Sequence, residues 1–409
     1  MSSSKSRSLT FVMVAVFSML FPSANAFSQT ESVLYTFTDG ADGGGPFGGL
    51  IFDSAGNLYG DTSAGGVDNG NGGLGVVFEL SPSSGAWTET PLYAFQGGST
   101  DGRVPFGGVV FDSAGNLYGT TSFGGTHDEG TVFELSPAIG GGWTEQIIYN
   151  FGDRANDATY PNGGLAIDSA GHLYGTSYAG GANNLGAVFE VSPRTGGGWS
   201  ETVILSGTAA DGDHFNSGVT VVGHNLYVPA ANGGSPGYGA IYLLSRSSSG
   251  WTATVIYSFL GGSDGIEPVG GLAFQAPGRI FGTTDFGGTY SSGTAFELTE
   301  SSGTWTKTIL HNFGESTDAA YPANPLTIGP SGQLYGTAGS GGTLGNGAAF
   351  ELVKLDGVWK EKILHNFNTG SSDVGGPAGG IVLDSSGNLY GMGHNGGSYG
   401  AGGIYEIVP

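Results

Sequence analysis

Short runs in which apolar and polar residues alternate fill the chain after residue 30, and turns rich in Gly, Ser and Asp separate them. One unit contains four such runs: GGVVFD (Gly107–Asp112), NLYGTTS (Asn116–Ser122), GTVFELSP (Gly130–Pro137) and WTEQIIYNF (Trp143–Phe151). Alternation with a period of two, in runs of β-branched and aromatic residues, indicates β-strands rather than helices. We therefore predict a unit of four short strands, here called A, B, C and D.

The unit recurs along the whole chain. Its strand B carries Leu-Tyr-Gly or a close variant seven times at a spacing close to 55 residues, with central residues Tyr59, Tyr118, Tyr174, Tyr227, Phe281, Tyr335 and Tyr390. A fixed period of this size is typical of a solenoid or a propeller.

The two ends of the chain distinguish these architectures. TESVLYTF (Thr30–Phe37) aligns with the strand D run TETPLYAF (Thr88–Phe95), whereas the final GGIYEIVP is a strand C with no strand D after it. Joining the ends gives seven complete units and leaves no long exposed sheet edge, while an open β-solenoid would not need a split unit. We predict an all-β fold, a single seven-bladed β-propeller over residues 27–409, closed by the N-terminal strand.

The first 26 residues have the features of a secretory signal peptide. Lys5 and Arg7 precede the apolar run LTFVMVAVFSMLF (Leu9–Phe21), and Ala24-Asn25-Ala26 forms a small-x-small cleavage site. The apolar run is short for a membrane span. We expect cleavage after Ala26, a mature chain that is extracellular or periplasmic, and no membrane span in it.

Composition narrows the classes of partner. The net charge of −23 repels phosphate backbones and anionic lipid, which argues against nucleic acid and membrane surfaces as partners. The chain has no cysteine, so disulfides do not stabilise it. It also carries no G-x-S-x-G elbow, no H-E-x-x-H zinc motif and no phosphate-binding loop.

The repeated unit resembles a known bacterial family. The run DSAGNLYGTT (Asp112–Thr121), followed by F-G-G and by GTVFELSP, is similar to the exported tandem-repeat family called GloVer, and the similarity extends over all seven units. The resemblance implies a propeller. It transfers no catalytic residues, because the biochemical role of the family is largely unassigned. Many members carry a C-terminal anchor, and no obvious one is visible here.

The loops between strand D and the next strand A share the motif Asp-x-x-x-Pro. We predict that these D–A loops and the B–C loops form one face around the central channel, where a ligand would bind. Seven acids near one axis could hold a cation such as Ca²⁺, although we favour the alternative that each Asp caps the amides of its own loop. The acids are Asp42, Asp101, Asp157, Asp211, Asp264, Asp318 and Asp373.

Departures from the repeat provide the other candidate residues on this face. Candidates for catalysis are His127, His214, His394, Tyr160 and Arg154. Candidates for ligand binding, chosen as aromatic and charged side chains in the D–A and B–C loops, are Arg103, Phe123, Tyr160, Tyr238, Glu267, Phe286, Tyr290, Tyr321 and Tyr399. His311 and His365 replace a strand D tyrosine, and we interpret them as structural or solvent-facing.

Aromatic rings beside acids and amides suit sugar stacking and hydrogen bonding to hydroxyls. We therefore predict a secreted, monomeric module that binds extracellular polysaccharide and needs no cofactor except, if any, Ca²⁺. One alternative is a polysaccharide lyase or glycoside hydrolase that uses the loop His, Tyr and Arg side chains. Another is a surface scaffold that binds other proteins.

Overall fold

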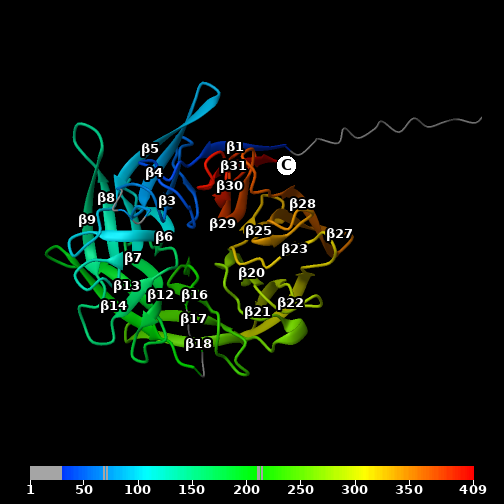
Figure 1. Cartoon of the computed structure of the whole chain (residues 1–409). Coiled ribbons are helices and arrows are strands. Elements are labelled where there is room, and N and C mark those ends of the chain that lie inside the picture. Colours follow the sequence, from blue (N-terminus) through cyan, green and yellow to red (C-terminus); the bar gives the residue numbers. More distant parts are fainter. Residues whose placement is uncertain (1–29, 68–69, 71, 210–211, 213–214) are drawn as a thin grey trace, which may run out of the picture.

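Seven antiparallel sheets form a ring in the computed structural model, which describes residues 30–67, 70, 72–209, 212 and 215–409 (Figure 1). The seven-bladed β-propeller predicted from the repeat is confirmed. The predicted signal peptide, residues 1–26, lies outside the described residues. In the described part of the chain, no helix combines the length and the apolar character needed to span a membrane.

Each blade contains strands A to D in chain order, from the channel outward. The first blade is β2 (Ile51–Phe52), β3 (Leu58–Thr62), β4 (Val76–Ser83) and β5 (Ala86–Ala94). The second is β6 (Gly102–Phe111), β7 (Leu117–Gly124), β8 (Thr131–Pro137) and β9 (Trp143–Asn150). The third is β10 (Ala158–Pro161) and β11 (Ala166–Ile167), both paired with β12 (Leu173–Gly180), then β13 (Ala187–Pro193) and β14 (Trp199–Ser206).

The remaining blades follow the same order. The fourth is β15 (Thr220–Val222), β16 (Asn225–Ala230), β17 (Ala240–Ser247) and β18 (Gly250–Ser258). The 3₁₀ turn η1 (Gly262–Asp264) leads to the fifth, β19 (Ala273–Gln275), β20 (Arg279–Thr284), β21 (Thr294–Ser301) and β22 (Thr304–Asn312). The sixth is β24 (Thr327–Ile328), β25 (Leu334–Ala338), β27 (Ala348–Leu355) and β28 (Val358–Asn366), beside the ribbon of β23 (Ala319–Ala320) and β26 (Ser340–Gly341).

The last blade joins the two ends of the chain. It consists of β29 (Val374–Leu383), β30 (Leu389–Gly396), β31 (Gly403–Val408) and, as its outer strand, β1 (Thr30–Thr36). Strand β1 pairs antiparallel with β31, from Thr30 opposite Val408 to Thr36 opposite Gly403, and Figure 1 shows the two strands side by side. The first strand of the chain thus completes the sheet begun by its last three.

Aromatic rings hold neighbouring blades together. The Phe that follows strand D packs edge-to-face on the central aromatic residue of strand C in the next blade, with centroids 5.1 Å apart for Phe95 and Phe133 and 5.0 Å apart for Phe151 and Phe189. Each such pair contributes about 0.5–1.5 kcal/mol beyond the area it buries. Between the third and fourth blades the strand D Phe is missing, and Phe215 from the D–A loop packs on Tyr242 instead. In this unit Phe215 stands where the other units have the loop Pro. Its ring replaces the missing strand D Phe in the contact between the blades.

The glycine of Leu-Tyr-Gly makes room for that strand C ring. A Cβ atom at Gly119 would lie 2.4 Å from Cζ of Phe133, which is closer than real contacts allow. The fourth blade has Val228 at this position together with Tyr242 in place of Phe. In the six blades that keep it, the glycine of the triplet therefore serves packing.

The Asp that opens the turn between strands A and B, Asp112 in the second blade, has a structural role. Oδ1 of Asp112 accepts hydrogen bonds from the backbone N–H groups of Ala114 at 2.8 Å and Asn116 at 2.9 Å, and Oδ2 accepts one from the Asn116 side chain. The carboxylate thereby fixes the A–B hairpin.

Candidate ligand-binding face

The D–A loops are anchored by the aspartates that the sequence singled out. The carboxylate of Asp101 accepts the backbone N–H of Gln96 at 2.6 Å and the hydroxyl of Tyr93 at 2.8 Å. Equivalent bonds from a loop N–H are made to Asp42, Asp157, Asp264 and Asp373. Each Asp caps its own loop at a blade interface. Asp318 contacts His311 instead, and Asp211 lies outside the described residues.

A shared ion on the axis does not fit this placement. Among the described residues, no three of these aspartates have ligand atoms within 4.8 Å of one another. The carboxylates point toward strand D of their own blade, because their hydrogen-bond partners are there.

The residue before the loop Pro has an unusual backbone. Its φ angle is +55° at Tyr160, +58° at Glu267 and +59° at Tyr321. Positive φ is uncommon for residues other than Gly, and Pro further restricts the residue before it. A hydrogen bond holds the conformation, since the N–H of Tyr160 donates to the carbonyl oxygen of Glu129 at 2.8 Å and that of Tyr321 to Ser292 at 2.9 Å. The side chain is thereby fixed on the D–A/B–C face.

Two of these positions carry aromatic pairs of the same geometry. Tyr160 packs edge-to-face on Phe123 at a centroid distance of 5.5 Å, with an angle of 60° between the ring planes. Tyr321 packs on Phe286 at 5.5 Å and 63°. Phe123 lies near the end of strand β7 and Phe286 two residues after strand β20. Tyr160 lies in β10 and Tyr321 directly after β23, both between strand D and the next strand A. Phe286 and Tyr321 are 39 % and 38 % exposed, so both offer ring surface to solvent.

A recess of about 430 Å³ opens beside the Phe123–Tyr160 pair. It lies between the second and third blades, and its other lining residues are Val104, Phe106, Ser122, Asn162 and Tyr178. Three further aromatic or amide side chains thus join the predicted pair. Apolar walls with a few hydrogen-bonding groups are typical of ligand pockets.

The mouth of the central channel forms a second cavity, of about 450 Å³. One side is a stack of three rings, with Phe47 parallel to Phe106 at 4.5 Å and to His394 at 5.0 Å. Phe106 and Asn162 line both the channel mouth and the recess. The aromatic surface therefore continues from the channel to the recess.

Hydrogen bonds of His394 fix its ring as part of this surface. Its Nδ1 lies 2.6 Å from the carbonyl oxygen of Gly376 and its Nε2 lies 3.1 Å from Nδ2 of Asn395. Nδ1 therefore donates the proton and Nε2 accepts from the amide, so neither nitrogen faces the cavity as a free base.

The other charged candidates have partners within the fold. Arg154 contacts Tyr149, Asp157 and the buried carboxylate of Glu201. The guanidinium of Arg103 lies 4.5 Å above the ring of Phe123 and pairs with Asp128. His127 pairs with Asp153 at 2.9 Å, and half of each side chain is exposed.

The remaining candidates lie in single loops of the face. Tyr238, Tyr290 and Tyr399 are exposed in B–C loops, and no described contact joins them to the two aromatic pairs. His214 lies outside the described residues.

A pair of carboxylates lies beside Phe286. The backbone of Asp285 is hydrogen bonded to that of Glu267 at 2.9 Å. Burial, assisted by the charge of Glu267, raises the pKa of Asp285 to about 6. A carboxylic acid with a raised pKa can donate a proton near neutral pH.

Sequence reasoning missed Phe47, Phe106, Tyr178 and Asn162. Three of these residues, Phe47, Phe106 and Asn162, occupy the position directly after the loop Pro, where other units have Asn, Val or Ala. Variation at this position is the signal that could have found them.

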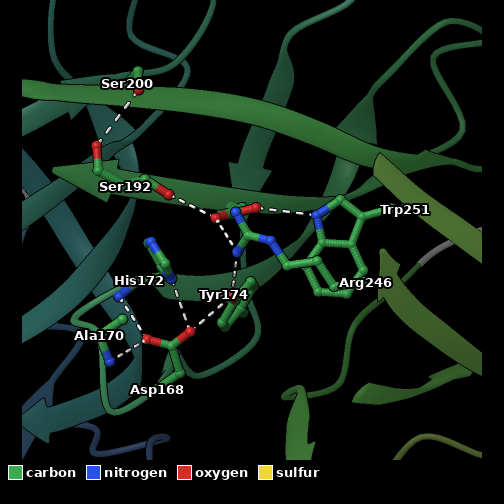
Figure 2. Close-up of polar contacts among 9 residues, drawn as sticks. Asp168, Ala170, His172, Tyr174, Ser192, Ser200, Arg246 and Trp251 are labelled. Atoms are coloured by element: carbon green, nitrogen blue, oxygen red, sulfur yellow. Dashed lines mark hydrogen bonds and ion pairs between the residues drawn. The ribbon is translucent and has the colours of Figure 1, made fainter. Parts of the chain in front are cut away.

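The opposite face carries a different cluster, drawn in Figure 2. Arg246 replaces a Pro of strand C in the fourth blade, and its guanidinium reaches Glu190 at 2.8 Å and the hydroxyl of Tyr174 at 3.2 Å. Trp251 donates from Nε1 to Glu190 at 3.1 Å. The buried Glu190 thus acquires its counter-charge from the unit that has Leu243 in place of the repeated strand C Glu. These contacts join the third and fourth blades.

A comparison with known protein families identifies the same repeat. The profile of the Gloeobacter/Verrucomicrobia repeat matches residues 19–166, 68–274 and 225–409. This chain belongs to that family. No curated protein matches its sequence significantly.

Several solved structures are similar to this Gloeobacter/Verrucomicrobia repeat protein at TM-scores below 0.5. One is a protein of unknown function from Dyadobacter fermentans DSM 18053, with 12 % identity, TM-score 0.47, and coverage of 92 % of this chain and 96 % of that chain. Another is AofleA from Arthrobotrys oligospora, with 14 % identity, TM-score 0.40, and coverage of 82 % and 89 %. A third is a puromycin-hydrolyzing peptidase from Mycobacterium tuberculosis, with 10 % identity, TM-score 0.46, and coverage of 86 % and 50 %. At these values, none bears on function.

Proposed function

We propose that the protein is a binding module for extracellular polysaccharide, and that sugar rings stack on the Phe123–Tyr160 and Phe286–Tyr321 pairs. The observation that carries this proposal is the occurrence of the same aromatic pair, half-buried for Phe123–Tyr160 and exposed for Phe286–Tyr321, at two blade interfaces of the D–A/B–C face. A pair that repeats around a ring suits a polymer, because one chain can occupy both positions and gain affinity through an effective local concentration.

Surrounding groups favour an uncharged polymer. Asn162 lines the recess, and its amide N–H group can hydrogen bond to hydroxyl groups while Ser122 holds its Oδ1 at 2.9 Å. The guanidinium of Arg103 already has a carboxylate partner in Asp128. A net charge of −23 repels polyanions. Neutral polysaccharides should therefore bind more tightly than polymers of uronic acids.

The test is co-sedimentation and affinity electrophoresis with neutral and uronate-containing polysaccharides. Tyr160→Ala should weaken binding about tenfold, which corresponds to about 1.4 kcal/mol. Ile139→Ala is the control, because Ile139 is exposed in a C–D turn at the opposite end of the blade from the D–A and B–C loops. Binding to neutral polymers that falls with Tyr160→Ala and not with Ile139→Ala supports the proposal. Equal binding by both variants contradicts it.

A second candidate function is glycoside hydrolysis at Glu267 and Asp285. It is favoured by the raised pKa of Asp285 beside another carboxylate and an exposed aromatic pair, since glycosidases use two carboxyl groups with unlike protonation. Mass spectrometry of the soluble products separates the two functions. New oligosaccharides that disappear with Asp285→Asn indicate hydrolysis, and intact polymer indicates binding alone.

A further inference from the structure

Six of the seven blade interfaces repeat the same polar position near their outer edge, and the interface between the third and fourth blades has the apolar Leu205 and Ala253 on its strands D instead. The polar position is formed by a strand D side chain, the Asp of the following D–A loop, and a strand D side chain of the next blade. At the interface of the first two blades these are Tyr93, Asp101 and Glu145, and the hydroxyl of Tyr93 donates to Asp101 at 2.8 Å. The nearby charge of Asp101 also acts on Glu145. Two carboxylates therefore face one another here.

Two interfaces place a cation at this position. Between the second and third blades, the guanidinium of Arg154 contacts both Asp157 and Glu201. Between the fourth and fifth blades, Lys307 replaces the Glu, and its Nζ lies 3.0 Å from Oδ1 of Asp264. The fold therefore accepts a positive charge between or beside these carboxylates.

Two other interfaces retain both carboxylates and exchange the Tyr for His. His311 lies 2.9 Å from Asp318, next to Glu361 of the sixth blade. His365 lies 3.0 Å from Asp373, next to Glu31 of β1. In each group, one potential ligand atom from each residue lies within 4.8 Å of the other two, and among the described residues only these two groups have that arrangement.

The side chains of these groups are largely shielded from solvent. His311 and Asp318 are 19 % and 8 % exposed, and His365 and Asp373 are 20 % and 11 % exposed. Oε1 of Glu361 and Oε1 of Glu31 are buried and have no hydrogen-bond partner. Of the two interpretations of these histidines, the structural one fits their burial and the solvent-facing one does not. Each group holds an unpaired carboxylate oxygen beside a His–Asp pair.

We propose that His311–Asp318–Glu361 and His365–Asp373–Glu31 are two sites for a divalent transition metal of the Zn²⁺ type. Imidazole nitrogen and carboxylate oxygen are both zinc ligands, and three such ligands leave a fourth tetrahedral position for water. Ca²⁺ fits less well, because it takes six to eight oxygen ligands. The metal replaces the charge that Arg154 and Lys307 supply at other interfaces, and it crosslinks adjacent blades.

The chain itself supplies the matched variants. His311→Tyr and His365→Tyr introduce the residue found at the same position in four other interfaces, where its hydroxyl bonds to the loop Asp. These variants should therefore fold while losing the nitrogen ligand. Tyr93→His makes the converse change at an interface that retains Asp101 and Glu145.

The experiment is equilibrium dialysis of the full-length purified protein against Zn²⁺, with metal measured by mass spectrometry and folding checked by circular dichroism. We expect two Zn²⁺ per chain, one in either His→Tyr variant, none in the double variant, and three in Tyr93→His. The proposal is overturned if the wild-type chain binds no Zn²⁺, or if the folded double variant binds as much as the wild type. Because no polysaccharide is present, the result is independent of the proposed function.

Discussion

Asp61 is the residue whose substitution has the most predictable consequence for stability. Other blades mostly have Thr at its strand B position, and Asp61 is completely buried. Its Oδ2 accepts the backbone N–H of Gly108 in the next blade at 3.0 Å, whereas its Oδ1 has no partner. Burial raises the pKa of Asp61 from 3.8 to about 7. The folded protein therefore favours the protonated form.

The direction of the pH dependence follows from this shift. Between about pH 4 and pH 7 the unfolded chain has lost the Asp61 proton, whereas the folded chain still holds it, so stability falls as pH rises. One pKa unit is about 1.36 kcal/mol, so the loss over the whole range is about 4 kcal/mol, and about 3 kcal/mol of it falls between pH 5 and pH 8. Asp61→Asn removes this titration and leaves all other carboxylates in place.

Urea unfolding of both proteins at pH 5 and pH 8 measures the effect. The free energy of unfolding of Asp61→Asn, relative to that of the wild type, should be higher at pH 8 than at pH 5 by about 3 kcal/mol. A difference that is the same at both pH values would show that the Asp61 carboxylate is ionised, or solvated, in the folded protein.

Two further predictions concern blade contacts and loop backbone. Arg154→Ala should lower the free energy of unfolding by about 2 kcal/mol, because the buried carboxylate of Glu201 loses its cation, and chemical denaturation checks this. Gly75→Ala should lower the free energy of unfolding by about 3 kcal/mol or more, because the new Cβ would lie 2.4 Å from Cδ of Pro105. Gly56→Ala should lower it by only about 1–2 kcal/mol, because its Cβ meets no atom within 4 Å and only the positive φ is unfavourable. Equal melting temperatures for the two Gly variants would contradict the steric argument.

The period and the chain ends were sufficient to predict the architecture, because each strand is specified locally by alternation and by turn chemistry. Strand boundaries were predicted less well where residues of a D–A loop pair with strand B and so lengthen strand A. β6 begins at Gly102 rather than Gly107, since Gly102 and Arg103 pair with the end of β7. Such pairing depends on contacts across the blade that sequence periodicity does not contain.

The candidate site was predicted residue by residue but not as an arrangement. Phe123 and Tyr160 were chosen separately, and their contact depends on the left-handed backbone that brings a D–A loop against the preceding blade. Phe47 and Phe106 were missed because they lie between the loop Pro and the predicted start of strand A, and their position was assigned to neither. His394 was proposed as a base, yet its two ring nitrogens are engaged by Gly376 and Asn395.

The central claim is that sugar rings stack on the Phe123–Tyr160 and Phe286–Tyr321 pairs. Its most direct test compares variants that lose the Tyr rings with variants that keep an aromatic ring at both positions. Isothermal titration calorimetry with a soluble neutral polysaccharide would measure the wild type, Tyr160→Ala/Tyr321→Ala and Tyr160→Phe/Tyr321→Phe. Stacking predicts that the Ala double variant binds about a hundredfold more weakly and that the Phe double variant stays near the wild type. Equal affinities for all three proteins, or no binding of any neutral polymer by the wild type, would contradict the account.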